Sequence, residues 1–539
     1  MINKSLSVLR NKVETSLSRR VNDARIREMA LAVAGRSVIN ADQKPIIFFN
    51  ASTRLGGLSL NAGFSLISAW AMRLQAIPVI HFVCKSGMSR CVLGTYRDNI
   101  EKRPPCKKCI AQSMTEYDNA RVIWFDYHPD PVLEQEIEKL SILELEEFSY
   151  ESIPLGKLVM PALRWELRKH HLADDQATRY LYGEFILSAW NVARNFIKLL
   201  EQITPQVVVV FNGQFFPEAV VRYIAHERGI RTIAHEVGLL PFTAFFTDGD
   251  ATAYPIDIPD DYILSEKQDQ QLDRYLEKRF QGNFKMAGIQ FWQGMKPLSP
   301  ELINMMAGYK QTIPVFTNVI FDTSQPHSNV VFSDMFSWLD TVLKLAKDHL
   351  ETLFVVRAHP DELRPGTAKQ SRETVRDWVK ASGAAQQQNI HFIDALEYVS
   401  SYELIQKTKF VMVYNSSIGL EAAIMGAAVL SAGKSRYTSY PTVFFPQSIP
   451  EYLEKVEEML NARDINIPTE FMVNARKFLY FQLFKTALPF DDFLEESRRP
   501  GLVFMKKFSV DQLSPDKSET LRVVTEGLIK NKPFLLGDG

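Results

Sequence analysis

Short apolar runs alternate with longer amphipathic stretches in two separate parts of the chain. The strand-like runs of the first part lie at residues 45–50, 77–83, 121–127, 206–211 and 230–234, with a mostly helical insert at 132–203. Those of the second part lie at residues 314–318, 353–358, 390–393, 410–414 and 428–432. Alternation of strands and helices at these spacings is typical of βαβ units that build a parallel sheet.

The length of 539 residues exceeds what one ordinary core supports. The pattern therefore predicts an α/β fold with two doubly wound domains that face each other across a cleft, with helical additions. We place the first domain at residues 1–295, which include a cysteine-containing segment at 84–109, and the second at 296–465. Residues 466–539 are expected to form a helical extension.

The overall composition narrows the function classes. A net charge of -1 gives no global field that would attract nucleic acid. No apolar run approaches the ~20 residues that a membrane-spanning helix needs, so we expect a cytoplasmic protein. The segment 4–36 carries eight basic and three acidic residues with apolar residues at helical spacing. It is either a helix packed on its own domain or a peripheral contact with the inner face of an anionic membrane.

Polar and basic side chains follow three successive predicted strands of the second domain. These are Arg357 with His359, then Ser416 with Ser417, then Lys434 with Arg436. In an open parallel sheet the ligand crevice lies outside the carboxyl ends of the strands, so these groups should meet at one site. Their chemistry suits the phosphate of an activated nucleotide.

Each group has a predicted role and a plain structural alternative. Ser416 and Ser417 begin a helix, whose N–H groups and dipole attract a phosphate, or they only cap it. Lys434 and Arg436 neutralise a leaving phosphate, or they form a solvated loop. We further predict that Glu421 accepts hydrogen bonds from ribose hydroxyls. Two residues at the end of the strand 314–318 are expected to contact a donor phosphate: Thr317 and Asn318.

The same segments carry a family resemblance. Arg357-Ala-His359-Pro360, Ser416-Ser-Ile-Gly-Leu-Glu421-Ala422 and Gly433-Lys-Ser-Arg-Tyr437 resemble motifs of capsule polysaccharide synthesis glycosyltransferases, including the Kdo transferases of the bacterial capsule linker. The resemblance implies the GT-B fold of two Rossmann-like domains. It also implies a nucleotide-sugar donor bound by the His-Pro and Ser positions, and a surface polysaccharide or lipid-linked glycan as acceptor.

Two other functions stay open at this point. The glycerophosphate transferases of teichoic acid synthesis share a similar His-Pro and Ser-Ser layout, which leaves transfer from a nucleotide-polyol such as CDP-glycerol as an alternative. A non-catalytic protein of the same fold that binds a glycan or a partner enzyme is the third reading.

A transferase also needs a base that takes the proton from the attacking hydroxyl. His235 and Glu236 follow the strand 230–234, and we predict Glu236 as this base and His359 as a catalytic contact to the leaving group. His235 is the alternative base, or it would contact the donor or the acceptor, although a salt-bridging Glu beside a structural His explains the pair as well. Asn212 and Arg54, which follow two other strands of this domain, are predicted to bind acceptor hydroxyls.

All four cysteines fall within 26 residues: Cys84, Cys91, Cys106 and Cys109. The pair Cys106-Lys-Lys-Cys109 has the spacing of a zinc knuckle, and the other two would complete a four-thiolate structural site. An iron–sulfur cluster is the less favoured alternative, because thiolates alone also bind iron.

Overall fold

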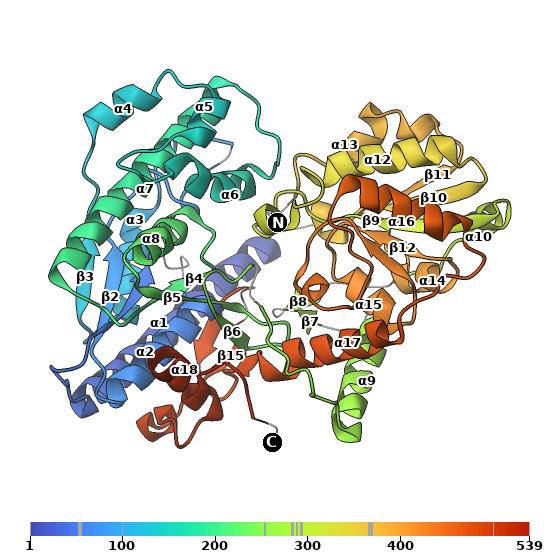
Figure 1. Cartoon of the computed structure of the whole chain (residues 1–539). Coiled ribbons are helices and arrows are strands. Elements are labelled where there is room, and N and C mark those ends of the chain that lie inside the picture. Colours follow the sequence, from blue (N-terminus) through green and yellow to red (C-terminus); the bar gives the residue numbers. More distant parts are fainter. Residues whose placement is uncertain are drawn as a thin grey trace.

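The computed structural model shows two α/β domains side by side (Figure 1). It describes residues 2–51, 57–96, 98, 99, 101–252, 255–281, 285, 286, 289, 290, 295–364, 370–497, 499 and 501–537. Side chains are described for these residues except 2–16, 285, 286, 289 and 290.

The N-terminal domain is built on a seven-stranded sheet in the order β14-β6-β5-β4-β1-β2-β3. Its strands are β1 (Ile46–Asn50), β2 (Val79–Cys84), β3 (Val122–Phe125), β4 (Val207–Phe211), β5 (Arg231–Val237), β6 (Thr243–Asp248) and β14 (Leu488–Pro489). β1 to β5 are parallel, whereas β6 and β14 run antiparallel to their neighbours. The sheet order reverses between β1 and β4, which is where an open α/β sheet binds its ligand.

The C-terminal domain has a wholly parallel sheet of five strands in the order β11-β10-β9-β12-β13. The strands are β9 (Gln311–Phe316), β10 (Thr352–Arg357), β11 (Ile390–Ile393), β12 (Val411–Val413) and β13 (Val429–Ser431). The switch point here lies between β9 and β12. Both domains thus share one doubly wound, Rossmann-like order, and the predicted fold class is confirmed.

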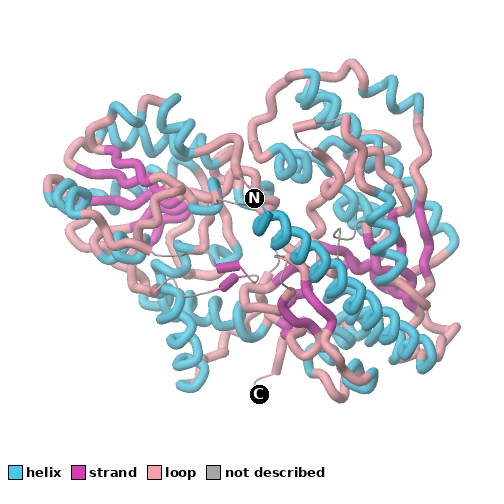
Figure 2. The backbone as a smooth tube through the Cα atoms, turned by 180° about the vertical axis from the view of Figure 1, so that it is seen from behind, coloured by secondary structure: helices cyan, strands magenta, loops and turns pink. Residues whose placement is uncertain are grey.

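Helices cover both faces of each sheet (Figures 1 and 2). Those of the N-terminal domain are α1 (Ile2–Arg36), α2 (Leu60–Leu74), α3 (Cys106–Glu116), α4 (Pro131–Ile137), α5 (Ile142–Glu147), α6 (Leu155–Leu167), α7 (Gln176–Gln202), α8 (Phe216–Glu227) and α18 (Glu519–Lys530). Those of the C-terminal domain are α10 (Pro300–Ala307), α11 (Gln325–Ser328), α12 (Met335–Asp348), α13 (Val375–Ala381), α14 (Ser401–Gln406), α15 (Ile418–Ile424) and α16 (Ile449–Asn461).

Local sequence signals set the ends of many of these helices. Ser59, Asp175 and Asp334 each occupy an N-cap and accept a hydrogen bond from a backbone N–H in the first turn of α2, α7 and α12. The strands are almost continuously apolar, as in β4 (Val-Val-Val-Val-Phe), because helices bury both faces of a parallel sheet.

The strand that carries the predicted base is longer than expected. We predicted a strand over 230–234, but β5 continues to Val237 because it pairs antiparallel with β6, from Ile233–Asp248 to Val237–Ala244. His235 and Glu236 therefore lie within a strand and not beyond its end.

The C-terminal segment crosses from one domain to the other. α17 (Thr469–Tyr480) packs against α15 and α9 (Glu266–Phe280), and β14 then joins the edge of the N-terminal sheet. A small antiparallel sheet of β15 (Leu494–Glu496) and β16 (Val503–Met505) follows before α18. The predicted helical extension thus also contains strands. They are two or three residues long, which is too short for a periodic pattern to reveal.

The basic N-terminal helix lies along its own domain (Figure 2). In the part of α1 whose side chains are described, Ile26, Ala30 and Val33 are fully buried. Arg25 donates a hydrogen bond to the Met505 carbonyl. This half of α1 follows the packed alternative, and membrane contact stays a prediction. Among the described residues no helix combines the length and hydrophobicity that a membrane span requires.

Candidate functional site

A cleft of about 740 Å³ lies between the two domains. The N-terminal domain and the segment that follows it line the cleft with Asn212, Glu236, Ala251, Thr252 and Pro255. The C-terminal domain lines it with Asp322, Thr323, Ser324, Pro326, His327, Ser328, Val330, Asn415, Ser417, Leu420, Lys434, Ser435, Arg436, Tyr437 and Ser439, and α17 and the turn after it add Phe478 and Gln482. Cavities of roughly 300–1,000 Å³ hold small-molecule ligands in other proteins.

Five of the residues that we predicted for the site line this cleft: Asn212, Glu236, Ser417, Lys434 and Arg436. They come from both domains: Glu236 lies near the end of β5, and the other four follow the carboxyl ends of β4, β12 and β13. The convergence follows from the two sheet orders, which place strand ends near the switch points at one crevice.

Among the described residues, three N–H donors hold the Glu236 carboxylate. Asn61 Nδ2 donates to Oε1 at 2.9 Å, the Val237 backbone N–H donates to the same oxygen at 2.9 Å, and Asn212 Nδ2 donates to Oε2 at 3.1 Å. Donors of this kind favour the ionised form and fix its orientation. A carboxylate on the cleft wall can accept a proton from a bound hydroxyl.

His235 does not share the cleft with Glu236. Its side chain is 2% exposed and its ring lies 5.5 Å from that of Phe246. Burial lowers the pKa of His235 to about 4, so the imidazole is neutral at physiological pH. Neighbouring side chains on a strand point to opposite faces, which is why the predicted pair of contacts does not form.

Two cations line the opposite wall. Lys434 is exposed to the cleft, and no ion pair with a described residue holds its ammonium group. Arg436 donates from Nη2 to the carbonyl of Ala251 at 3.1 Å, and its guanidinium carbon lies 5.5 Å from the centre of the Phe245 ring. Arg436 therefore joins the two domains at the edge of the cleft.

The two serines after β12 differ in position. Ser417 is exposed and lines the cleft, whereas Ser416 is buried and its carbonyl accepts a hydrogen bond from the Tyr437 hydroxyl at 2.7 Å. A Cβ at Gly419 would lie 2.5 Å from that hydroxyl. The absence of a side chain at Gly419 thus makes room for the Tyr437 hydroxyl.

Glu421 also lies away from the cleft. Its carboxylate, on a side chain that is 4% exposed, pairs with Arg279 of α9 at 2.6 Å and accepts a hydrogen bond from the Tyr402 hydroxyl at 2.5 Å. The structure does not place Glu421 at the cleft for the predicted contact with ribose hydroxyls, because Oε1 is held by the ion pair that joins α9 to α15 and Oε2 by the Tyr402 hydroxyl.

His359, Thr317 and Arg357 form a hydrogen-bonded group at the ends of β9 and β10. The Thr317 hydroxyl donates to the Arg357 carbonyl at 3.0 Å and accepts from the His359 backbone N–H at 3.1 Å. His359 Nδ1 accepts from the Asp361 N–H, and burial lowers the pKa of the imidazole. None of the three lines the cleft described above. Their predicted contacts with the donor stay predictions.

Arg357 is almost fully buried. Its Nη1 donates to the Asp394 carbonyl at 2.7 Å, while Nε and Nη2 have no hydrogen-bond partner among the described residues. Burial lowers the pKa of Arg357 to about 10.

A chain of amides connects this group to the cleft. Asn318 donates to Asn415 at 2.6 Å, and Asn415 in turn donates to the Ser328 hydroxyl at 2.6 Å. Asn415 and Ser328 line the cleft, but Asn318 stands behind them. Arg54, the remaining predicted contact, lies outside the described residues.

Sequence reasoning missed a polar group in the cleft. His327 of α11 places Nε2 3.2 Å from Oδ2 of Asp250, which follows β6, and 2.8 Å from Nε2 of Gln214. Asp250 also lies 3.4 Å from Arg222. His327 lies in an irregular segment between β9 and α12 and does not follow a strand directly. The search for polar residues at predicted strand ends therefore could not identify it.

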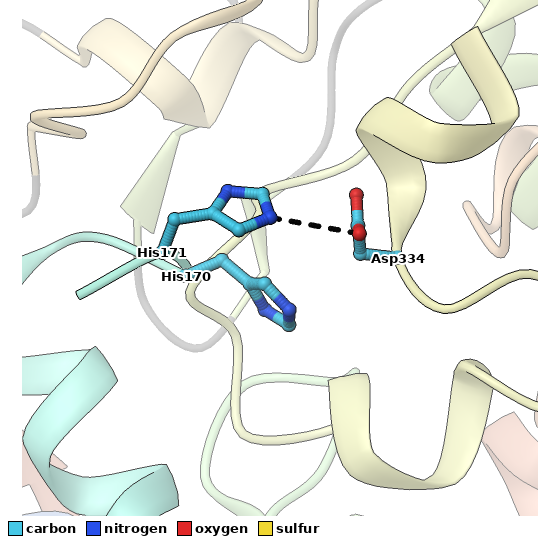
Figure 3. Close-up of side chains that lie close together, drawn as sticks. All are labelled: His170, His171 and Asp334. Carbon is cyan, nitrogen blue, oxygen red and sulfur yellow. Dashed lines mark ion pairs between the residues drawn. The ribbon is translucent and has the colours of Figure 1, made fainter. Parts of the chain in front are cut away.

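A second ionic junction joins the domains outside the cleft. His171, after α6, bridges Asp334 and Glu373 of the C-terminal domain, with its Nε2 3.6 Å from the Asp334 carboxylate (Figure 3). Hydrogen bonds with Asp334 and Glu373 raise the pKa of His171 to about 10. One potential metal-ligand atom from each of His170, His171 and Asp334 lies within 4.8 Å of the other two. Since these partners already form ion pairs, we interpret the cluster as a junction.

The four cysteines surround one small cavity in the N-terminal domain, of about 30 Å³. No three of their Sγ atoms lie within 4.8 Å of one another. Burial raises the pKa of Cys91 to about 12 and also raises that of Cys84. The structure thus brings the predicted ligands to one place, and their binding of a metal stays a prediction.

Comparison with known proteins bears on the C-terminal domain. Residues 293–440 match the family described as "Capsule polysaccharide biosynthesis protein". The predicted resemblance is confirmed there. This region contains β9 to β13 and all the motifs that carried the resemblance. No curated protein matches the chain.

Solved structures give weaker likenesses. Two are structures of KpsC from Thermosulfurimonas dismutans. The structure titled β-Kdo 2,4 transferase is 11% identical, with a TM-score of 0.34, and the match covers 57% of this chain and 87% of that one. The structure titled β-Kdo 2,7 transferase is 13% identical, with a TM-score of 0.32, and the match covers 63% of this chain and 90% of that one. UDP-GlcNAc 2-epimerase from Neisseria meningitidis has 13% identity and a TM-score of 0.25 over 82% and 99%. At these TM-scores the likenesses carry no functional argument.

Proposed function

We propose that this protein is a glycosyltransferase that moves a sugar from a nucleotide-activated donor to a hydroxyl of a surface polysaccharide or lipid-linked glycan. The observation that carries the proposal is the placement of Glu236 and of the cations Lys434 and Arg436 in one cleft between two Rossmann-like domains. The family match of residues 293–440 supports the same class of chemistry.

The C-terminal wall suits the phosphate of the donor. Lys434 brings an ammonium group that no described carboxylate neutralises, and Ser417 and Ser435 bring hydroxyls to the same wall. Cations fixed where negative charge develops stabilise a leaving phosphate, and they act more strongly in a cleft that excludes water than in bulk solvent. The nucleotide would therefore bind on the side of β12 and β13.

The N-terminal wall suits the acceptor. Glu236 would take the proton from the acceptor hydroxyl, while that oxygen forms a bond to the anomeric carbon of the donor. The bond between the anomeric carbon and the phosphate oxygen breaks, and the phosphate leaves with the electron pair. Asn212, which also holds Glu236, keeps the carboxylate pointed at this position.

A panel of donors tests the proposal. The purified chain would be incubated with nucleotide sugars and with nucleotide polyols such as CDP-glycerol, and the released nucleotide would be measured by chromatography. We expect release and transfer with a nucleotide sugar. Release with a nucleotide polyol alone would replace the proposal with polyol-phosphate transfer. Absence of calorimetric binding to any CMP, CDP, UDP or GDP compound would indicate a non-catalytic binding protein.

A further inference from the structure

We infer that the four cysteines bind one zinc ion, which fixes residues 84–109 at the carboxyl edge of the N-terminal sheet. All four thiols line one cavity, and the chain has no other cysteine. The cavity also reaches Ala51, directly after β1. Residues from the ends of two neighbouring strands and from α3 thus converge on one point.

A backbone N–H group points at one of the sulfurs. The Gly87 N–H donates to Cys84 Sγ at 3.2 Å, and in the corresponding turn the Gly94 N–H donates to the Cys91 carbonyl at 3.0 Å. Both cysteines belong to a Cys-x-x-Gly sequence and thus stand at the start of a tight turn. A hydrogen bond to sulfur favours a thiolate, the form of cysteine that binds metals.

Gly94 cannot be replaced in this turn without a clash. A Cβ there would lie 3.0 Å from Cys91 Sγ and 2.5 Å from Cβ of Pro104. The chain before α3 therefore packs directly on the turn that holds Cys91.

The other two sulfurs lie at a helix N-terminus. Cys106 is the first residue of α3 and Cys109 lies in its first turn. α3 has no side-chain cap and no acidic residue in that turn, so its dipole is available to the thiolates. Lys107 and Lys108 between them are exposed and offset the negative charge of four thiolates around a divalent ion.

The size of the cavity favours one ion over a cluster. A cavity needs about 10–15 Å³ to hold one water molecule. The cavity of about 30 Å³ therefore suits a single ion and is small for the several atoms of an iron–sulfur cluster. Zinc takes four thiolates in a tetrahedron, which leaves no position for a substrate. The ion would therefore be structural, and binding would draw the sulfurs closer together.

The inference adds to the proposed function without depending on the donor site. A fixed segment 84–109 would form part of the acceptor side, next to the end of β1, whereas the nucleotide would bind in the other domain. Loss of the ion should therefore lower the melting temperature and raise the KM for the acceptor, and it should leave the Kd of the donor unchanged.

Metal content of the full chain provides the test. We expect about one zinc per chain by mass spectrometry and X-ray absorption distances of ~2.3 Å to sulfur only. The double variant Cys106→Ser/Cys109→Ser should lose the zinc. The matched control His170→Ala, which alters the other cluster of metal-ligand type, should keep it.

A reagent assay on the wild-type chain covers the case in which the double variant does not fold. A mercurial that titrates thiols should release one zinc as four thiols react. Iron with acid-labile sulfide, or a metal-free chain whose four thiols react at once, would overturn the inference. Neither result depends on whether any donor is turned over, so a failed donor assay would not be mistaken for a failed metal site.

Discussion

His327 of the C-terminal domain and Asp250 of the N-terminal domain are in polar contact across the cleft, with 3.2 Å between Nε2 and Oδ2. Burial would raise the pKa of Asp250, but its bonds with His327 and Thr252 and the charge of Arg222 keep it below the ordinary value. Any opening of the cleft at this point must break the pair.

We expect the two residues to be energetically coupled. His327→Gln and Asp250→Asn should each lower the melting temperature and the free energy of unfolding. The double variant should lose less free energy of unfolding than the two single variants together, and the difference should be about 0.5–3 kcal/mol. Thermal scans of all four proteins measure this. His226→Gln, at the exposed pair with Glu227, is the control and should change little. Strict additivity would show that the contact does not hold the domains.

Glu236→Gln should reduce transfer by about 10²–10⁴-fold, the usual contribution of a general base. The fold and the Kd of the donor should be unchanged, because the carboxylate lies on the acceptor wall. Initial rates and calorimetry on the same preparation check this. Glu227→Gln on the surface of α8 is the control, and a Glu236→Gln variant with wild-type turnover would remove the base from the mechanism.

Lys434→Ala should weaken donor binding. A hydrogen bond to a charged group contributes about 1.5–3 kcal/mol, so the Kd should rise roughly 10- to 150-fold. Donor analogues that lack the phosphates should bind both proteins equally. The exposed Lys347 on α12 offers the comparison, since Lys347→Ala should bind the donor as the wild type does. Equal Kd values for Lys434→Ala and wild type would place the phosphate elsewhere.

The pair Arg279–Glu421 should matter for stability and not for the ligand. Removal of one partner leaves a buried charge, which costs about 3–5 kcal/mol, so Glu421→Gln should lower the melting temperature markedly. Arg279→Met/Glu421→Leu should recover much of the loss. If Glu421 contacted the ribose, the wild type would instead bind ribonucleotides more tightly than deoxyribonucleotides, and Glu421→Gln would lose that preference. Calorimetry distinguishes the two outcomes.

These residues show what the sequence could and could not predict. Strand ends that carry polar groups predicted the cleft side chains Ser417 and Lys434, because the sheet order forces such ends together. The same rule failed for Glu421, which lies one turn inside α15. Its partner Arg279 belongs to a helix 142 residues away in sequence, and no local pattern relates the two. The prediction that His235 follows the end of its strand failed because β5 continues to Val237, where it pairs with the antiparallel strand β6.

The junction at His171 should weaken in alkaline solution. The pKa of His171 is raised from 6.5 to about 10 by Asp334 and Glu373, so its stabilising effect is complete below pH 6.5 and is lost as the pH rises through about 10. Melting temperatures of wild type and His171→Gln should therefore differ most at about pH 6 and converge above about pH 10. A constant difference across that range would exclude the ionised imidazole as the cause.

The return of the chain through α17 to β14 makes the architecture non-modular. The N-terminal sheet is completed by β14, which follows the whole C-terminal domain in the chain and is synthesised after it. A fragment that stops before α17 would leave the edge of β6 without its partner strand and α2 without α18. Truncation at a single position therefore cannot give an intact N-terminal domain. During synthesis, the N-terminal sheet cannot be completed before the C-terminal domain has been made.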